Sequence, residues 1–187
     1  MNSIKADFFY RKPLKKGESK PNFGLTEADP DRPDHKSFER EVINARSKLT
    51  SFKREGFKLL NHKSSVEDFY DNQSVSSVYY LEMQELAKKE TNAEEVFIVS
   101  HITRNELEAQ KGKRLGAHRL VHNDFTPNFN QTVKPIIENT TFKPSRISVF
   151  NLWRRFDKDG LDAPFAVCDS STVSEQELIP TDLYNYL

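Results

Sequence analysis

The sequence predicts an α+β fold in which helical segments come first and a β-rich core follows. Apolar residues recur at helical spacing between residues 37 and 89, whereas β-branched and aromatic runs dominate after residue 93. The later runs are short and joined by polar connections, which is typical of an antiparallel sandwich or small barrel. The length of 187 residues is that of one domain, so we predict a single domain over residues 1–187.

The first 92 residues divide into an arm and a helical region. Residues 1–35 are rich in proline and lack strong periodicity, so we expect an extended arm. Residues 36–92 are predicted to be mainly helical, with one helix over residues 37–54 and a second over residues 74–89. Gly56 has the position of a helix-ending glycine, which supports the end of the first helix.

Residues 93–187 form the predicted β-rich core. Val, Ile, Phe and Trp favour strands because β-branched and aromatic side chains pack well on a pleated surface. The clearest strand is Arg146–Arg155, in which successive side chains point to opposite faces. Within this core, strands are predicted over residues 96–103, 120–125, 146–155 and 164–169, and two shorter strands precede it at 6–10 and 57–61. A short helix is predicted over 132–139 and a loop over 107–115. No closing strand is predicted over 180–187.

Composition excludes several classes of function. The 28 basic and 28 acidic side chains balance, so no electrostatic attraction predicts nucleic acid or an anionic membrane as a partner. We find no apolar run that spans a bilayer and no secretory signal, and therefore expect a cytoplasmic protein. The single cysteine, Cys168, excludes an internal disulfide and is interpreted as a buried core residue.

The strongest chemical signal is the segment Leu115–Thr126, which contains His122 and Asp124. In an extended segment, residues two apart share a face and aim an imidazole nitrogen and a carboxylate oxygen at one point. Such a pair is two-thirds of the two-His-one-carboxylate triad that binds Fe(II). The alternative is a surface strand end whose aspartate begins a turn before Pro127. No histidine follows His122 in this sequence, so the third ligand is not identified.

Two other histidines are candidate neighbours of this pair. On a strand, His118 lies too far along the chain to bind a metal with His122. On a helix the two would form a zinc-binding pair, but Gly116 and Val121 disfavour that helix. His101 lies in a predicted strand and is interpreted chiefly as a histidine satisfied by hydrogen bonds.

Arg154 and Arg155 end a predicted strand and are candidate cofactor-binding residues. A guanidinium pairs bidentately with a carboxylate, which suits the distal carboxylate of a 2-oxo acid. The competing interpretation, to which we give equal weight, is an ion pair with Asp157 or Asp159. Trp153 is interpreted as a core residue rather than a platform for substrate.

Several segments, taken together, resemble a known family. They are Arg54–Asp71, Val78–Arg104, Arg119–Thr126 (RLVHNDFT), Asn151–Arg155 (NLWRR) and Asp162–Leu183, in this order. They resemble the AsaB/CmcJ-type hydroxylase/desaturase family, also called gibberellin-desaturase-like. The resemblance implies a non-haem oxygenase of secondary metabolism that uses Fe(II) and 2-oxoglutarate as cofactors and hydroxylates or desaturates a small molecule. It also implies that His122 and Asp124 are iron ligands and catalytic residues.

The same resemblance implies a double-stranded β-helix, a jelly-roll or cupin-like core flanked by the N-terminal helices. The family pattern continues into a distal histidine and a further segment, whereas this sequence ends at Leu187. We therefore expect an incomplete core, truncated at the C-terminus, with less than full activity; the alternative is that another residue or water fills the third site. The second hypothesis is a non-catalytic cupin-like interaction module. The third is a zinc protein that uses His118 and His122.

Overall fold

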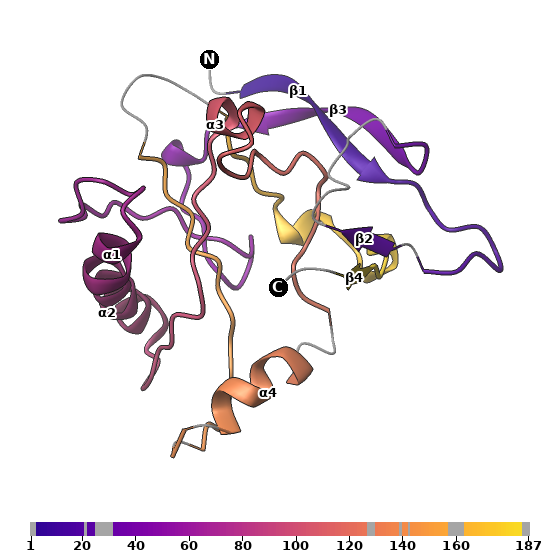
Figure 1. Ribbon diagram of the computed structural model, residues 1–187. Helices are drawn as coiled ribbons and strands as arrows, with labels where there is room; N and C mark the ends of the chain where they lie inside the picture. Colours follow the sequence, from indigo (N-terminus) through magenta and orange to yellow (C-terminus); the bar gives the residue numbers. More distant parts are fainter. Residues whose placement is uncertain are drawn as a thin grey trace. The chain divides into compact units, whose positions relative to one another are not determined.

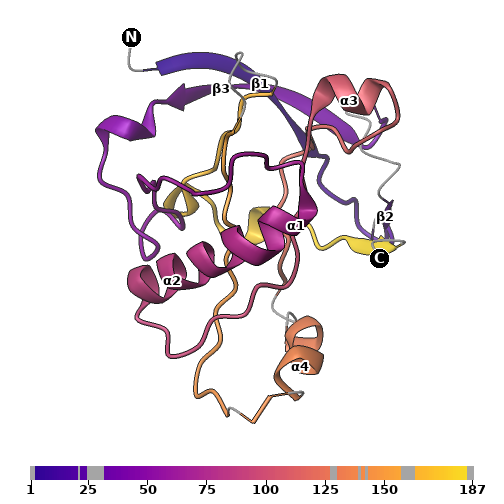
Figure 2. The same ribbon diagram turned by 60° about the vertical axis from the view of Figure 1, so that its left-hand side comes forward.

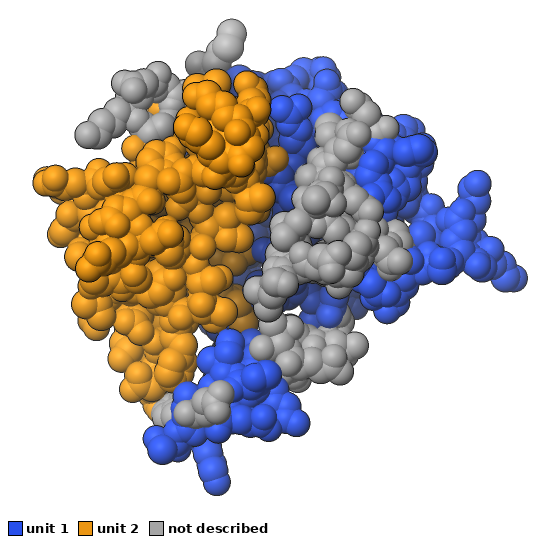
Figure 3. Space-filling view, viewed as in Figure 1, with its two compact units in different colours: residues 1–59, 118–148, 166–187 blue, residues 60–117, 149–165 orange. Residues whose placement is uncertain are grey.

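The computed structural model describes residues 3–20, 22–24, 32–126, 130–138, 140–141, 143–156 and 163–184. The chain divides into two compact units (Figure 3). Unit 1 contains residues 1–59, 118–148 and 166–187, and unit 2 contains residues 60–117 and 149–165. Because each unit is assembled from separate stretches, neither corresponds to the arm, the helical region or the β-rich core predicted from the sequence.

A two-stranded antiparallel sheet is the main regular element of unit 1 (Figure 1). Strand β1, Ser3–Arg11, pairs with β3, His35–Ile43, in a register that places Phe8 opposite Phe38. β1 confirms the strand predicted over residues 6–10, but β3 shows that the helix predicted over residues 37–54 is wrong. The spacing of four between apolar residues fits both structures, because residues four apart share a face in a strand as well as in a helix.

The remainder of that predicted helix is a series of turns. Ala45–Ser47 forms one 3-10 turn, and Leu49 is 95% exposed rather than part of a buried stripe. The Glu55 N–H donates to the Ser51 carbonyl oxygen at 3.0 Å and closes another turn. Gly56 follows with a φ of +80°, the left-handed conformation expected of a helix-ending glycine, although no long helix precedes it.

Two further elements complete the regular structure described in unit 1. Helix α4, Asn130–Glu138, confirms the short helix predicted over residues 132–139, and its Val133 is buried. Strand β2, Asn22–Gly24, pairs in parallel with β4, Asp182–Tyr184. The prediction that residues 180–187 contain no strand is therefore wrong.

The main helix of unit 2 consists of α1, Asn72–Ser74, a π-helical turn, Val75–Tyr79, and α2, Tyr80–Thr91 (Figure 2). It confirms the helix predicted over residues 74–89. The Asp71 carboxylate caps it by accepting from two backbone N–H groups, and Asn92 ends it with a φ of +55°. Within the described residues, no helix has the length and apolar character needed to cross a membrane.

Most of the strands predicted after residue 56 are absent from the described residues. The segments 57–61, 96–103, 146–155 and 164–169 belong to no sheet, and in 120–125 only Leu120 forms a bridge. The composition of these segments favours an extended chain, but a strand also needs a neighbour that completes its ladder of hydrogen bonds. The first part of the loop predicted over 107–115 is instead helical, because residues 107–110 belong to a short helix, α3, Glu106–Gln110. The jelly-roll core stays a prediction.

Candidate functional site

The predicted metal ligands His122 and Asp124 lie together in unit 1. His122 Nε2 is 3.5 Å from Asp124 Oδ1, and the side chains are 42% and 41% exposed. Two neighbouring donors that each lie about 2.1 Å from one octahedral ion are about 3 Å apart. The pair therefore needs only a small movement to share a metal ion.

Leu120 anchors this segment and orients the His122 ring. Leu120 is buried and bridges to Phe9 of β1, and the Val121 N–H donates to the Phe9 carbonyl oxygen at 2.8 Å. His122 Nδ1 lies 2.7 Å from the Leu120 carbonyl oxygen. Because a carbonyl oxygen only accepts, Nδ1 carries a proton, and in the neutral imidazole the lone pair is then on Nε2, the nitrogen nearest Asp124. This is the tautomer that a metal-binding Nε2 requires.

His118 belongs to the same cluster, contrary to the prediction that it lies too far from His122. The centroids of the two rings are 4.3 Å apart and the ring planes cross at 61°. The prediction assumed a regular strand, which this segment does not form. Across the part of the chain that the structure describes, however, no three or more His, Cys, Asp or Glu side chains form a metal-binding group. The residues fit two ligands of an iron site and identify no third.

Arg154 is held in a cluster of unit 2. Its Nη2 donates to His62 Nδ1 at 2.6 Å and to the His62 carbonyl oxygen at 3.1 Å, and its Nε donates to the Tyr79 hydroxyl at 3.1 Å. The guanidinium carbon also lies 5.4 Å from the Tyr79 ring centroid and 5.8 Å from that of Phe69. These contacts favour a packing role for Arg154, since its hydrogen bonds and its planar face are both used.

The role of Arg154 or Arg155 in binding a carboxylate stays a prediction. Arg155 is exposed, whereas Arg154 is partly buried in the cluster described above. Asp157 and Asp159, the alternative partners of these arginines, lie outside the described residues, as does Pro127 after the histidine segment.

His101 confirms the interpretation of a histidine satisfied by hydrogen bonds. Its Nε2 lies 3.1 Å from Asn72 Oδ1, and its Nδ1 lies 2.8 Å from the Tyr80 hydroxyl. The amide oxygen accepts from Nε2–H, so the Tyr80 hydroxyl donates to Nδ1. Both ring nitrogens are therefore engaged within unit 2.

Trp153 and Cys168, which were interpreted as core residues, are exposed. Trp153 is 54% exposed and stacks on Phe165 with ring centroids 4.3 Å apart. The Cys168 thiol is also at the surface. Both residues lie in segments that were predicted to be paired strands. Neither segment pairs with another strand, so neither side chain is buried as expected.

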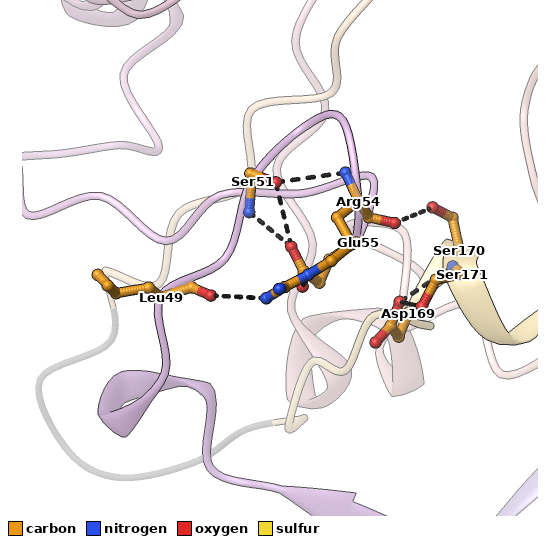
Figure 4. Close-up of polar contacts among 7 residues, drawn as sticks. All are labelled: Leu49, Ser51, Arg54, Glu55, Asp169, Ser170 and Ser171. Carbon is orange, nitrogen blue, oxygen red and sulfur yellow. Dashed lines mark hydrogen bonds and ion pairs between the residues drawn. The ribbon is translucent and has the colours of Figure 1, made fainter.

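A polar cluster that no sequence pattern indicated links the turn at residues 49–56 to residues 169–171 of unit 1 (Figure 4). The Ser170 N–H donates to the Glu55 carbonyl oxygen at 2.9 Å, and the Ser170 hydroxyl donates to the Arg54 carbonyl oxygen at 3.1 Å. These partners are more than a hundred positions apart in the sequence, so no local pattern reveals them. Gly56 is the one local signal of a special backbone conformation at this place.

The carboxylates of this cluster are stabilised in their charged form. The Glu55 side chain is 8% exposed, and the Ser51 N–H that donates to it at 2.7 Å is the main cause that lowers the pKa of Glu55. The neighbouring Arg54 guanidinium contributes in the same direction. The Ser171 hydroxyl is the main cause that lowers the pKa of Asp169. Hydrogen bonds to a carboxylate favour its ionised form, which explains both directions.

Comparison with known families identifies the class of protein. The family model described as the Oxidoreductase/YMDC permease-like domain matches residues 8–186. The chain therefore belongs to this family, and the match includes the His122–Asp124 segment as well as both compact units.

Individual relatives come from fungi. The chain is 29% identical over 153 residues to the alpha-ketoglutarate-dependent dioxygenase phiK of a Fungal sp., covering 77% of this chain and 55% of phiK. It is 29% identical over 147 residues to hydroxylase/desaturase CTB9 of Cercospora beticola, covering 67% and 44%. It is also 29% identical over 192 residues to the Fe(II)/2-oxoglutarate-dependent dioxygenase nvfI of Aspergillus novofumigatus, covering 97% and 65%. The chain thus spans about half the length of the curated relatives it matches.

Proposed function

We propose that the chain is part of a non-haem Fe(II)/2-oxoglutarate-dependent hydroxylase or desaturase of the AsaB/CmcJ type, acting on a small molecule in secondary metabolism. The observation that carries the proposal is the orientation of His122. Its Nδ1–H is fixed on the Leu120 carbonyl oxygen, and its Nε2 faces the Asp124 carboxylate at 3.5 Å. The names of the fungal relatives support the same reaction class.

In this proposal His122 and Asp124 hold the metal through Nε2 and Oδ1. The Leu120 carbonyl keeps the proton of His122 on Nδ1, so that a lone pair and a negative charge face the same point. Fe(II) bound there with 2-oxoglutarate would activate dioxygen, which is the four-electron oxidant: two electrons would come from the substrate and two from 2-oxoglutarate, which would leave as succinate and CO2. The exposed pair leaves room for the cosubstrate beside the metal.

The proposal includes the double-stranded β-helix as the fold of the complete enzyme. Its support is the presence of segments with strand-like composition that belong to no sheet, chiefly 96–103 and 146–155. Several of their large apolar side chains are exposed, including Val99 at 71% and Trp153 at 54%.

Binding of 2-oxoglutarate tests the function. Calorimetric titration without oxygen should show that 2-oxoglutarate binds the wild-type chain only in the presence of Fe(II), since the keto acid binds through the metal. His122→Ala should abolish this binding, and His101→Ala, which removes a histidine of unit 2, should preserve it. Iron-independent binding, or an effect of His101→Ala equal to that of His122→Ala, would contradict the proposal.

A non-catalytic cupin-like interaction module is the second candidate. It is favoured by one observation, that no metal-binding group of three or more His, Cys, Asp or Glu side chains is formed in the described parts of the chain. Succinate formation from 2-oxoglutarate in the presence of Fe(II) and oxygen separates the two candidates. Iron-dependent turnover by the purified chain excludes the second candidate, whereas Fe(II) binding without turnover favours it.

A further inference from the structure

His118 contacts both the Leu120 carbonyl oxygen and the His122 ring. Its Nδ1 lies 3.3 Å from the Leu120 carbonyl oxygen, the same atom that accepts from His122 Nδ1 at 2.7 Å. Two imidazoles four positions apart therefore converge on one carbonyl. Their ring centroids are 4.3 Å apart, in an edge-to-face arrangement.

This arrangement constrains the His122 ring from two sides. The carbonyl accepts from Nδ1–H and fixes the proton, but a single hydrogen bond leaves an imidazole free to tilt and rotate. The His122 side chain is 42% exposed, so few protein atoms pack against the ring to prevent this movement. The adjacent His118 ring is partly buried and supplies a wall at van der Waals distance.

We propose that His118 is a positioning residue for His122 and not itself a metal ligand. Its ring holds His122 on the Leu120 carbonyl, so that His122 Nε2 stays directed toward Asp124. The absence of a three-residue metal-binding group among the described residues agrees with a role outside the ligand set. The inference rests on the proposed function in that His122 binds the metal, but the position of the His122 ring is measurable without metal.

Two substitutions at one position separate the possible roles of His118. His118→Phe keeps an aromatic wall and removes both ring nitrogens, whereas His118→Ala removes the wall as well. The matched control is His101→Ala, which deletes a histidine whose partners, Asn72 and Tyr80, lie in unit 2. Circular dichroism of each variant checks that the chain remains folded.

The first measurement is the affinity for Co(II), an Fe(II) substitute, followed by visible absorption. Loss of an outer partner of a metal ligand weakens binding by about 10- to 100-fold. We expect at least about 10-fold weaker binding for His118→Ala, and binding within about 3-fold of wild type for His118→Phe and His101→Ala. Equal loss in the Ala and Phe variants would identify His118 as a ligand and overturn the proposal, as would unchanged binding in His118→Ala.

The second measurement reads the His122 ring in the metal-free protein. Nitrogen-15 chemical shifts at about pH 8, above the ordinary imidazole pKa, report which ring nitrogen carries the proton. We expect a single Nδ1–H tautomer in wild type and His118→Phe, and a mixture in His118→Ala. Identical His122 shifts in all three proteins overturn the positioning role. If wild type binds no Co(II), the proposed function fails, and the nitrogen shifts still decide the role of His118.

Discussion

His122 and Asp124 take their contacts from one short segment of unit 1, whereas Arg154 takes its contacts from residues 75 and 92 positions earlier in unit 2. The first pair is nearly half exposed, and the Arg154 side chain is packed against aromatic rings. The difference indicates a division of roles. The local segment presents donor atoms to solvent, while the long-range cluster fixes how distant stretches of chain pack together.

The largest stability effect is expected at Arg154, because three hydrogen bonds and two ring contacts depend on its guanidinium. Arg154→Ala should lower the free energy of unfolding by about 3 kcal/mol in urea titrations. Arg154→Lys keeps the charge but not the planar fork, and should restore only part of the loss. Co(II) affinity at His122 should change by less than about 3-fold in folded Arg154→Ala. A large loss of Co(II) affinity in Arg154→Ala would contradict the separate roles of the His122–Asp124 segment and the Arg154 cluster.

Gly56 lies at a long-range contact within unit 1, where its backbone approaches Ser170. A Cβ added at Gly56 would lie 3.0 Å from the Ser170 hydroxyl oxygen, and the φ of +80° disfavours any side chain. Gly56→Ala should lower the free energy of unfolding by about 2 kcal/mol. Gly17→Ala is the matched control, because Gly17 also has a positive φ but no atom within 4 Å of the added Cβ, and should cost about 1 kcal/mol. Equal losses of unfolding free energy in Gly56→Ala and Gly17→Ala would show that the close approach to Ser170 adds nothing to the cost at Gly56.

A smaller effect is expected from the local cap of the main helix in unit 2. The Asp71 carboxylate accepts from the Gln73 and Ser74 N–H groups. Asp71→Ala should lower the free energy of unfolding measured in urea titrations, because both cap hydrogen bonds are lost. Ser74→Ala should have less effect, because Ser74 lies inside the helix and not at its cap. A greater loss of stability in Ser74→Ala than in Asp71→Ala would contradict the assignment of Asp71 as the cap.

The smallest effect concerns pH and the cluster in Figure 4. The Ser51 N–H lowers the pKa of folded Glu55, so the ionised carboxylate stabilises the fold above the ordinary glutamate pKa of about 4.3. That contribution is lost as the pH falls below this value and through the lowered pKa of the folded state. Glu55→Gln should flatten the acid side of the stability profile. The control Glu94→Gln, at an exposed position, should leave the profile unchanged, and equal profiles for wild type and Glu55→Gln would contradict the assignment.

The same contrast explains what was predictable from the sequence. The His122–Asp124 pair was predicted because two residues two positions apart need only a short segment to meet. The main helix of unit 2 was predicted because its apolar spacing and its stop at Asn92 are local. The Arg154 cluster and the Ser170 contacts with Arg54 and Glu55 were not predictable, since their partners are fixed by packing between distant stretches.

The wrong predictions also have physical causes. The segment 37–54 was predicted as helix because its apolar residues recur every three or four positions. The spacing of four between Phe38 and Val42 also fits a strand, and pairing with β1 decided the outcome as far as Ile43. His118 was placed too far from His122 because a regular strand was assumed. Paired strands were predicted where the composition favours an extended chain, but pairing depends on a neighbouring strand that composition does not specify.

The central claim is that His122 and Asp124 form a metal site that the Leu120 carbonyl orients. Its most direct test is Fe(II) affinity, measured without oxygen by calorimetry for wild type, His122→Ala and Asp124→Asn, with His101→Ala as the control. We predict that His122→Ala and Asp124→Asn each weaken Fe(II) binding by more than about 100-fold, a larger loss than that caused by removing a residue that only contacts a metal ligand. The control should bind Fe(II) within about 3-fold of wild type. Absence of Fe(II) binding in wild type, or equal binding in all four proteins, would contradict the claim.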